Sequence, residues 1–123
     1  MFALGDVIRF HSAIAGKVKY HLCISMGGHY LLINSPNSTS YPGDFVVPCS
    51  DFPFLKPTPE GVSVVCCTLI LEIDDATLAK LSPVKRGSVS IDLLKRLVKF
   101  VQASPVMSDE DKECIMDAVG DWV

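Results

Sequence analysis

The stretch KYHLCIS, residues 19–25, alternates between apolar side chains at its even-numbered positions and polar or small ones at the odd-numbered positions. Such a period of two predicts a β-strand with one face toward a core. A glycine-rich turn, MGGH at 26–29, follows it, and the apolar run YLLIN at 30–34 comes next. The order strand, turn, strand predicts a β-hairpin around which the rest of the fold is built.

Outward from this hairpin, three more runs are rich in β-branched and aromatic residues, at 7–10, 45–49 and 61–73. The last is long enough to bend and so to serve two sides of a closed sheet. A polar loop at 35–43 and an irregular stretch at 50–59 separate these runs. The second contains the apolar cluster FPFL at 52–55, which is either a lid over the core or part of an interface, and the sequence slightly favours the interface. About five strands with short connections predict a small β-barrel, because closing the sheet removes its exposed edges.

After residue 74 the spacing of apolar residues changes from a strand period to a helical one. Asp75 is predicted to cap a short helix that Pro83 terminates, and Ser90 to cap a longer one whose apolar stripe begins at Ile91. Ser108 starts a third helix with acidic residues in its first turn, where the helix dipole favours them. The predicted fold class is therefore mainly β with two to three C-terminal α-helices.

Length and composition point to one domain, residues 1–123, with the barrel at 1–74 and the helical part at 75–123. No apolar run approaches the roughly 20 residues of a membrane span, and no secretory signal pattern opens the chain. Five cysteines without a C-x-x-C pair are typical of reduced thiols in a cytoplasmic protein. We therefore expect a cytoplasmic chain with no membrane contact, no metal site and no cofactor.

The charge distribution is uneven although the net charge is only −3. Residues 7–43 contain no Asp or Glu but include Arg9, Lys17, Lys19 and all three histidines, whereas 13 acidic and 8 basic residues follow. A locally positive surface attracts anions whatever the sign of the total charge. This pattern predicts an anionic partner at the N-terminal half, although chance segregation in a short chain is an equal alternative.

Several segments, in order and spacing, resemble the MazF/PemK family of endoribonuclease toxins. The family begins with a Gly-Asp strand, similar to GDVI at 5–8, and continues with a strand of the form Arg-Pro, four apolar residues and Ser, similar to residues 19–25. Its next strand ends in Thr or Ser, as LLINS does at 31–35. The segments 41–46 and 85–89 also resemble family segments, and the likeness covers roughly residues 5–103.

This resemblance implies an SH3-like β-barrel that carries helices on its C-terminal side and forms a homodimer. It also implies a growth-inhibiting toxin that cleaves single-stranded RNA without a metal ion and that a partner antitoxin protein inhibits. The family's catalytic pair is the Arg that opens the second strand and the Thr or Ser that ends the third. In this sequence the two positions are Lys19 and Ser35.

Lys19 departs from the family pattern, as does Tyr20 in place of proline. Lysine keeps the positive charge but loses the planar fork with which arginine holds two phosphate oxygens. His21 lies two residues on, on the same predicted strand face, and its imidazole suits proton transfer near neutral pH. Our hypothesis is that Lys19 holds the phosphate, His21 moves the proton and Ser35 orients the scissile group.

Three further residues are candidates for substrate binding. Arg9 and Lys17 border the predicted cleft and would contact phosphates, and Tyr41 would stack on a base. The alternative for Arg9 and Lys17 is an ordinary solubility role, and for Tyr41 a place in the core or at its rim.

Two other classes of protein remain open from the sequence. One is a barrel that has lost catalysis and acts as an RNA-binding or protein-interaction module. The other is an NlpC/P60-like cysteine hydrolase, to which the Gly-Asp strand and His21 bear a faint likeness. Its nucleophile would be Cys66 or Cys67, which lie in a strongly apolar run.

Overall fold

The computed structural model describes residues 2–36 and 41–120, and that part of the chain forms six strands, three α-helices and one short 3-10 helix. The strands are β1 (Asp6–Ser12), β2 (Lys17–Ser25), β3 (His29–Asn34), β4 (Asp44–Pro48), β5 (Val62–Glu72) and β6 (Val84–Ser88). The helices are η1 (Cys49–Asp51), α1 (Asp75–Ala79), α2 (Ile91–Ala103) and α3 (Asp109–Val119).

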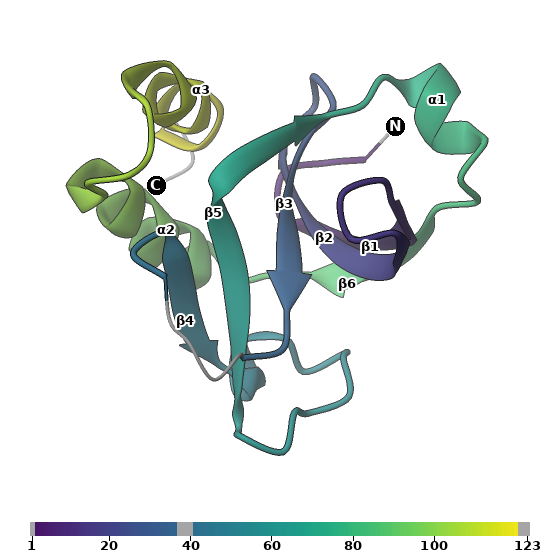
Figure 1. The fold of residues 1–123 in the computed structure, drawn as a ribbon, viewed down its shortest axis with the longest axis horizontal. Coiled ribbons are helices and arrows are strands. Elements are labelled where there is room, and N and C mark those ends of the chain that lie inside the picture. The colour runs from purple at the N-terminus through teal and green to yellow at the C-terminus, as the bar shows by residue number, and fades with distance from the viewer. Residues whose placement is uncertain (1, 37–40, 121–123) are drawn as a thin grey trace.

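All six strands belong to one antiparallel sheet in the order β4-β5-β3-β2-β1-β6 (Figure 1). The predicted mainly β fold with C-terminal helices is confirmed. Between the described parts of β4 and β6 no pairing closes the sheet, so its hydrogen-bonded ladder is open at those two strands. Figure 1 also shows β5 bending along its length, as its run of 11 residues leads us to expect.

The sixth strand, β6, is one more than the sequence predicts, and it lies in the segment expected to lead into a helix. It pairs with β1, and Asp6 of that strand fixes it from the side. The Asp6 Oδ1 atom accepts a hydrogen bond from Ser88 Oγ at 2.8 Å and lies 3.1 Å from Lys85 Nζ. The strand therefore depends on contacts distant in sequence, which local patterns cannot reveal.

Both faces of β2 are buried in its central part, residues 21–24. Leu22 and Ile24 belong to the larger core cluster, which includes residues of α2 and α3. Cys23, from the opposite face, belongs to a smaller cluster with Phe10 of β1 and Leu78 of α1. Figure 1 shows α2 and α3 at one end of the sheet and α1 at the other. The alternation of residues 19–25 therefore separates two cores rather than a core from solvent.

The two longer helices begin where the sequence predicts. Ser90 and Ser108 are the N-caps of α2 and α3, and each side chain accepts a hydrogen bond from the backbone N–H three residues on. The predictions for Asp75 and Ile91 are wrong. Asp74 caps α1 instead, and Ile91 is exposed because it occupies the outward side of the first turn of α2.

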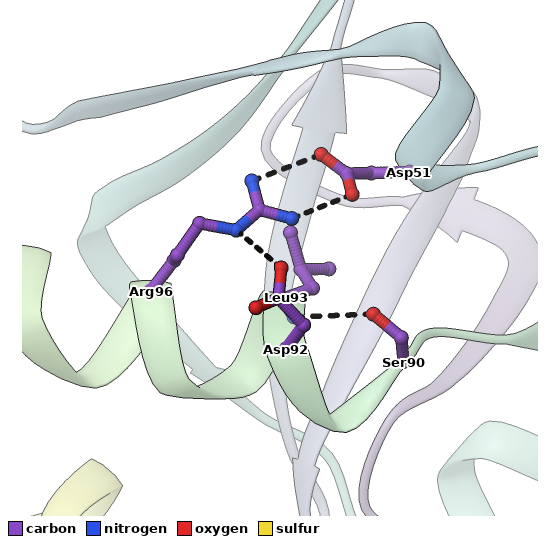
Figure 2. Close-up of polar contacts among 5 residues, drawn as sticks. All are labelled: Asp51, Ser90, Asp92, Leu93 and Arg96. Carbon is purple, nitrogen blue, oxygen red and sulfur yellow. Dashed lines mark hydrogen bonds and ion pairs between the residues drawn. The ribbon is translucent and has the colours of Figure 1, made fainter.

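The loop 49–61, between β4 and β5, is fastened to α2 by one arginine (Figure 2). Arg96 donates to both carboxylate oxygens of Asp51, at 2.6 and 3.0 Å, and its Nε donates to Asp92 at 3.0 Å. Phe52 of the same loop is buried in the main core. The apolar residues of this loop thus cover the core of their own chain, whereas the sequence slightly favours an interface for them.

Phe54 of the loop packs against β6 at a glycine. A Cβ atom added at Gly87 would overlap the ring of Phe54. Glycine at this position therefore lets the loop approach the sheet.

None of the helices in the described part of the chain has the length and apolar character of a membrane-spanning helix.

Candidate anion-binding pocket

A pocket of about 290 Å³ opens where β1, β2 and β3 meet the loop 49–61. We call it the cationic pocket. The described residues that line it are Arg9, Lys17, Val18, Lys19, Tyr20, Ile33, Asn34, Ser35, Leu55, Lys56, Thr58 and Ser63. It thus combines the middle of β1, the beginning of β2, the end of β3 and the beginning of β5 with a loop that is distant in sequence.

The strand register explains why the predicted pair meets there. Tyr20 of β2 pairs with Arg9 on one side and with Ile33 on the other. Because β2 and β3 are antiparallel, the beginning of β2 lies beside the end of β3. Lys19 and Ser35 therefore reach the same pocket, which is the arrangement on which the sequence hypothesis depends.

The pocket is positively charged. Arg9, Lys17, Lys19 and Lys56 line it, and no Asp or Glu is among its described lining residues. Within residues 2–36 and 41–120, none of these four cations forms an ion pair. Burial, and then the neighbouring charge of Lys17, lower the pKa of Lys19 below its usual range. An anion that entered the pocket would relieve this repulsion.

The loop wall of the pocket is held by sulfur and hydroxyl contacts. The backbone N–H of Thr58 donates to the Cys49 sulfur at 3.4 Å, and the Thr58 hydroxyl donates to the carbonyl of Val62 at 2.6 Å. Together with the Asp51–Arg96 ion pair, these contacts fix the loop that carries Lys56. The pocket is therefore shaped before any ligand arrives, which limits the entropy lost on binding.

His21 does not line the cationic pocket. Its side chain is completely buried, and its ring stacks on Phe10 with the ring centroids 3.7 Å apart. Neither ring nitrogen makes a well-aligned hydrogen bond to the described residues, although the backbone of Ile8 and Lys19 lies near enough to offset part of the cost of charging the ring. Burial lowers the pKa of His21 to about 4, so the ring is neutral at physiological pH. The structure thus separates the predicted proton carrier from the predicted phosphate-binding residue.

A second pocket, of about 490 Å³, lies beside the first and shares Asn34 and Ser35 with it. We call it the Asp44 pocket. Its described lining consists of Asn34, Ser35, Tyr41, Pro42, Gly43, Asp44, Val64, Cys66, Thr68 and Val106. The structure therefore divides the predicted binding residues. Arg9 and Lys17 line the cationic pocket, whereas Tyr41 lines the Asp44 pocket.

Sequence reasoning missed Lys56 and Asn34. Lys56 belongs to a loop that the sequence marks only as irregular, and it reaches the pocket through folding of the chain rather than through local spacing. Asn34 precedes the predicted Ser35 at the end of β3, and its amide Nδ2 donates to Cys66 Sγ at 3.4 Å. Its place before a predicted site residue is the one signal that could have found it.

The cysteine-hydrolase alternative finds little support in this geometry. In the sheet, Leu32 pairs with His21 on one side and with Cys66 on the other, so a whole strand separates the two residues. Burial raises the pKa of the Cys66 thiol and raises that of Cys67 to about 12. Both thiols are therefore protonated at neutral pH, which makes them weak nucleophiles.

Comparison with known proteins adds no name to this site: no protein-family model matches the chain, and no curated protein matches it. Among the described residues, no group of three or more His, Cys, Asp or Glu side chains is arranged to hold a metal ion. The cationic pocket offers four cations and the hydroxyl groups of Ser35, Thr58 and Ser63. Those features suit a phosphate or another compact anion.

Proposed function

We propose that this chain is a MazF/PemK-like toxin that cleaves single-stranded RNA without a metal ion. The observation that carries the proposal is that Lys19 and Ser35, the two positions matched to the family's catalytic pair, line one pocket. Arg9, Lys17 and Lys56 surround that pair with positive charge that forms no ion pair within the described part of the chain. This setting attracts a phosphodiester, and single-stranded RNA can bend to present one.

The proposal extends to the architecture and partners that belong with the family. The six-stranded sheet would be an SH3-like barrel, and the chain would act in the cytoplasm as a homodimer. An antitoxin protein would block the toxin by occupying the same pocket. An acidic segment suits that role, because carboxylates could pair with the four pocket cations in place of phosphates.

In the proposed reaction, the 2′-hydroxyl oxygen attacks phosphorus and the bond from phosphorus to the 5′-oxygen breaks. Lys19 stabilises the charge that grows on the phosphorane and gives its proton to the leaving 5′-oxygen, while Ser35 orients the phosphate. We assign no proton transfer to His21, because its ring is buried outside the pocket. The proton of the 2′-hydroxyl then passes to solvent, and the products are a cyclic phosphate and a 5′-hydroxyl.

This assignment predicts a particular pH dependence. The rate of cleavage rises with pH while solvent is the base, and it falls once Lys19 loses its proton. Because burial lowers the pKa of Lys19, that fall begins below the usual range for lysine. A rate profile governed instead by a group that titrates near neutral pH would contradict the assignment.

The direct test incubates the purified protein with single-stranded RNA, with and without EDTA. Cleavage that persists in EDTA and disappears in Lys19→Ala supports the proposal. Lys99→Ala serves as the matched control, because Lys99 is an exposed lysine of α2 that does not line the pocket. Cleavage of equal rate in all three proteins would indicate a contaminating nuclease and would refute the assignment.

Lys19→Arg is a second, more specific variant. Arginine restores the family's residue and can hold two phosphate oxygens at once, so we expect faster cleavage than in the wild type. In cells, forced expression of the wild type should stop growth, whereas Lys19→Ala should not. Growth arrest by both proteins would show that toxicity does not depend on Lys19 and would contradict a toxin role for the pocket.

A module that binds RNA or a protein without cleaving is the second candidate function. It is favoured by one observation: the described lining of the cationic pocket includes neither an imidazole nor a carboxylate to accept the 2′-hydroxyl proton. Such a module would bind RNA through the same four cations. Binding that is lost in Lys19→Ala, without cleavage at any pH, would decide for it.

A further inference from the structure

The Asp44 pocket continues the cationic pocket across a shared wall. Asn34 and Ser35, at the end of β3, line both of them. In a nucleotide the base and the phosphate are joined through one sugar, so adjoining pockets can hold the two parts separately. With a volume of about 490 Å³, the Asp44 pocket has room for a nucleobase.

The side chain of Asp44 is unusual in this setting because a carboxylate repels a phosphate. It is half-buried, and its Oδ2 accepts a hydrogen bond from the backbone N–H of Tyr41 at 3.2 Å. The described residues provide no hydrogen-bond partner for its Oδ1. A carboxylate accepts up to four hydrogen bonds, so this residue, which lines the pocket, retains acceptor capacity.

Two further residues of the pocket, Tyr41 and Asn34, have side chains that suit a nucleobase. Tyr41 is 58% exposed and lines the same pocket, so its aromatic ring is available to stack on a flat ligand. The amide of Asn34 lines it as well and is held by its contact with Cys66. An aromatic face with fixed polar groups is the combination that reads unstacked bases in single-stranded RNA.

We propose that the Asp44 pocket is a base subsite selective for guanine, next to the phosphate held by Lys19. Guanine alone among the four RNA bases presents two adjacent N–H donors, N1–H and N2–H, on its Watson–Crick edge. A carboxylate can accept both at once, whereas adenine, cytosine and uracil offer it one donor on that edge. That RNA is the natural ligand of this subsite rests on the proposed function. The selectivity for guanine depends only on the residues of the Asp44 pocket.

The simplest alternative is that Asp44 only closes the Tyr41–Asp44 turn. Asp44→Asn separates the two roles, because the amide oxygen of asparagine can still accept from the Tyr41 N–H. The NH2 group that replaces the other carboxylate oxygen is a donor, so it cannot accept a hydrogen bond from the second N–H of guanine. The variant therefore keeps the turn and loses the base contact.

The test measures the binding of guanosine, adenosine, cytidine and uridine, which carry no phosphate, by the backbone amide NMR shifts of Gly43 and Thr68. We expect guanosine to bind about 5- to 150-fold more tightly than the others, the range for a good bidentate base contact. Asp44→Asn should abolish this preference, and Lys19→Ala should leave it unchanged. Equal binding of all four, or a preference that survives in Asp44→Asn, would overturn the subsite.

An RNA-cleavage assay on the same proteins keeps the two proposals apart. Guanosine selectivity that depends on Asp44, without cleavage of any RNA, would end the nuclease proposal and leave the subsite standing. Cleavage that depends on Lys19, with equal binding of the four nucleosides, would do the reverse. Thermal unfolding of Asp44→Asn close to that of the wild type shows that the turn is intact.

Discussion

Two positively charged residues of this molecule have opposite surroundings, because in the part of the chain that the structure describes Arg96 is paired with carboxylates and Lys19 is not. Arg96 of α2 makes three hydrogen bonds to two carboxylates, Asp51 and Asp92. Lys19 of β2 shares its pocket with three more cations and has no ion-pair partner among the described residues. Charge that is paired holds the fold together, whereas clustered unpaired charge opposes folding and is retained where a ligand supplies the counter-charge.

The largest effect should come from removing the central unpaired cation. We expect Lys19→Ala to slow RNA cleavage by about 100- to 1,000-fold, the usual cost of deleting one group that stabilises transition-state charge. Its stability should stay the same or rise slightly, because repulsion with Lys17 is relieved. Initial rates and thermal unfolding of the same preparations measure both, and a loss of activity that follows from unfolding would break the comparison.

The next effect concerns His21, a buried titratable residue, and the dependence of stability on pH. The pKa of His21 is about 4 when folded and 6.5 in the unfolded chain, so the ring is neutral in both states above pH 6.5. Between pH 6.5 and about 4 the unfolded chain binds a proton that the native state does not, and stability falls as the pH falls. The loss reaches about 3 kcal/mol at the lower limit.

His21→Phe should remove this part of the acid sensitivity, because phenylalanine keeps a ring against Phe10 and does not titrate. Urea unfolding at several pH values measures the difference between the two proteins, which also cancels the contribution of the carboxylates. RNA cleavage at neutral pH should stay at the wild-type rate. A cleavage rate that collapses in a folded His21→Phe protein would restore the histidine to the mechanism.

Breaking the paired side of the comparison should have a moderate effect on stability. Arg96→Met keeps much of the side-chain length but leaves the Asp51 carboxylate, only 16% exposed, without its partner. We expect a loss of about 1–2 kcal/mol in the free energy of unfolding, because the pair is bidentate yet partly open to solvent. Lys95→Met, at an exposed position of α2, is the control and should change the free energy by less than about 0.5 kcal/mol.

The smallest effect concerns one peripheral charge of the pocket. Lys56→Gln should weaken RNA binding at low salt and reduce the slope of log affinity against log salt by about 0.7. The same variant should be as stable as the wild type or slightly more so, since it removes one of four mutually repelling charges. An unchanged salt slope would show that Lys56 does not contact a phosphate.

Local patterns were sufficient for most of the fold. The alternation in 19–25 and the β-branched runs place five strands, and the serines before α2 and α3 mark where those helices begin. The strand β6 is not predicted because its sequence, VKRGS, has no apolar alternation and most of its residues are exposed. Its pairing depends on Asp6, some 80 residues earlier in the chain.

The candidate site was predicted in part for the same reason. The register of neighbouring strands brings Lys19 and Ser35 to one pocket, which the sequence order anticipates. Periodicity also places His21 on the face of Lys19, but it cannot reveal that α1 and its Leu78 cover that face. Lys56 arrives from a loop whose path is set by Asp51 and Phe52, and no local signal encodes that path.

Gly87 has a consequence for engineering this molecule. The strand that contains it does not line the cationic pocket, yet the missing side chain decides how closely Phe54, two residues before Lys56, can approach. A single methyl group, as in Gly87→Ala, would displace the aromatic ring of Phe54, and we expect the loop that carries Lys56 to shift with it. The width of the pocket can thus be tuned from a position behind it, without altering any group that meets the ligand.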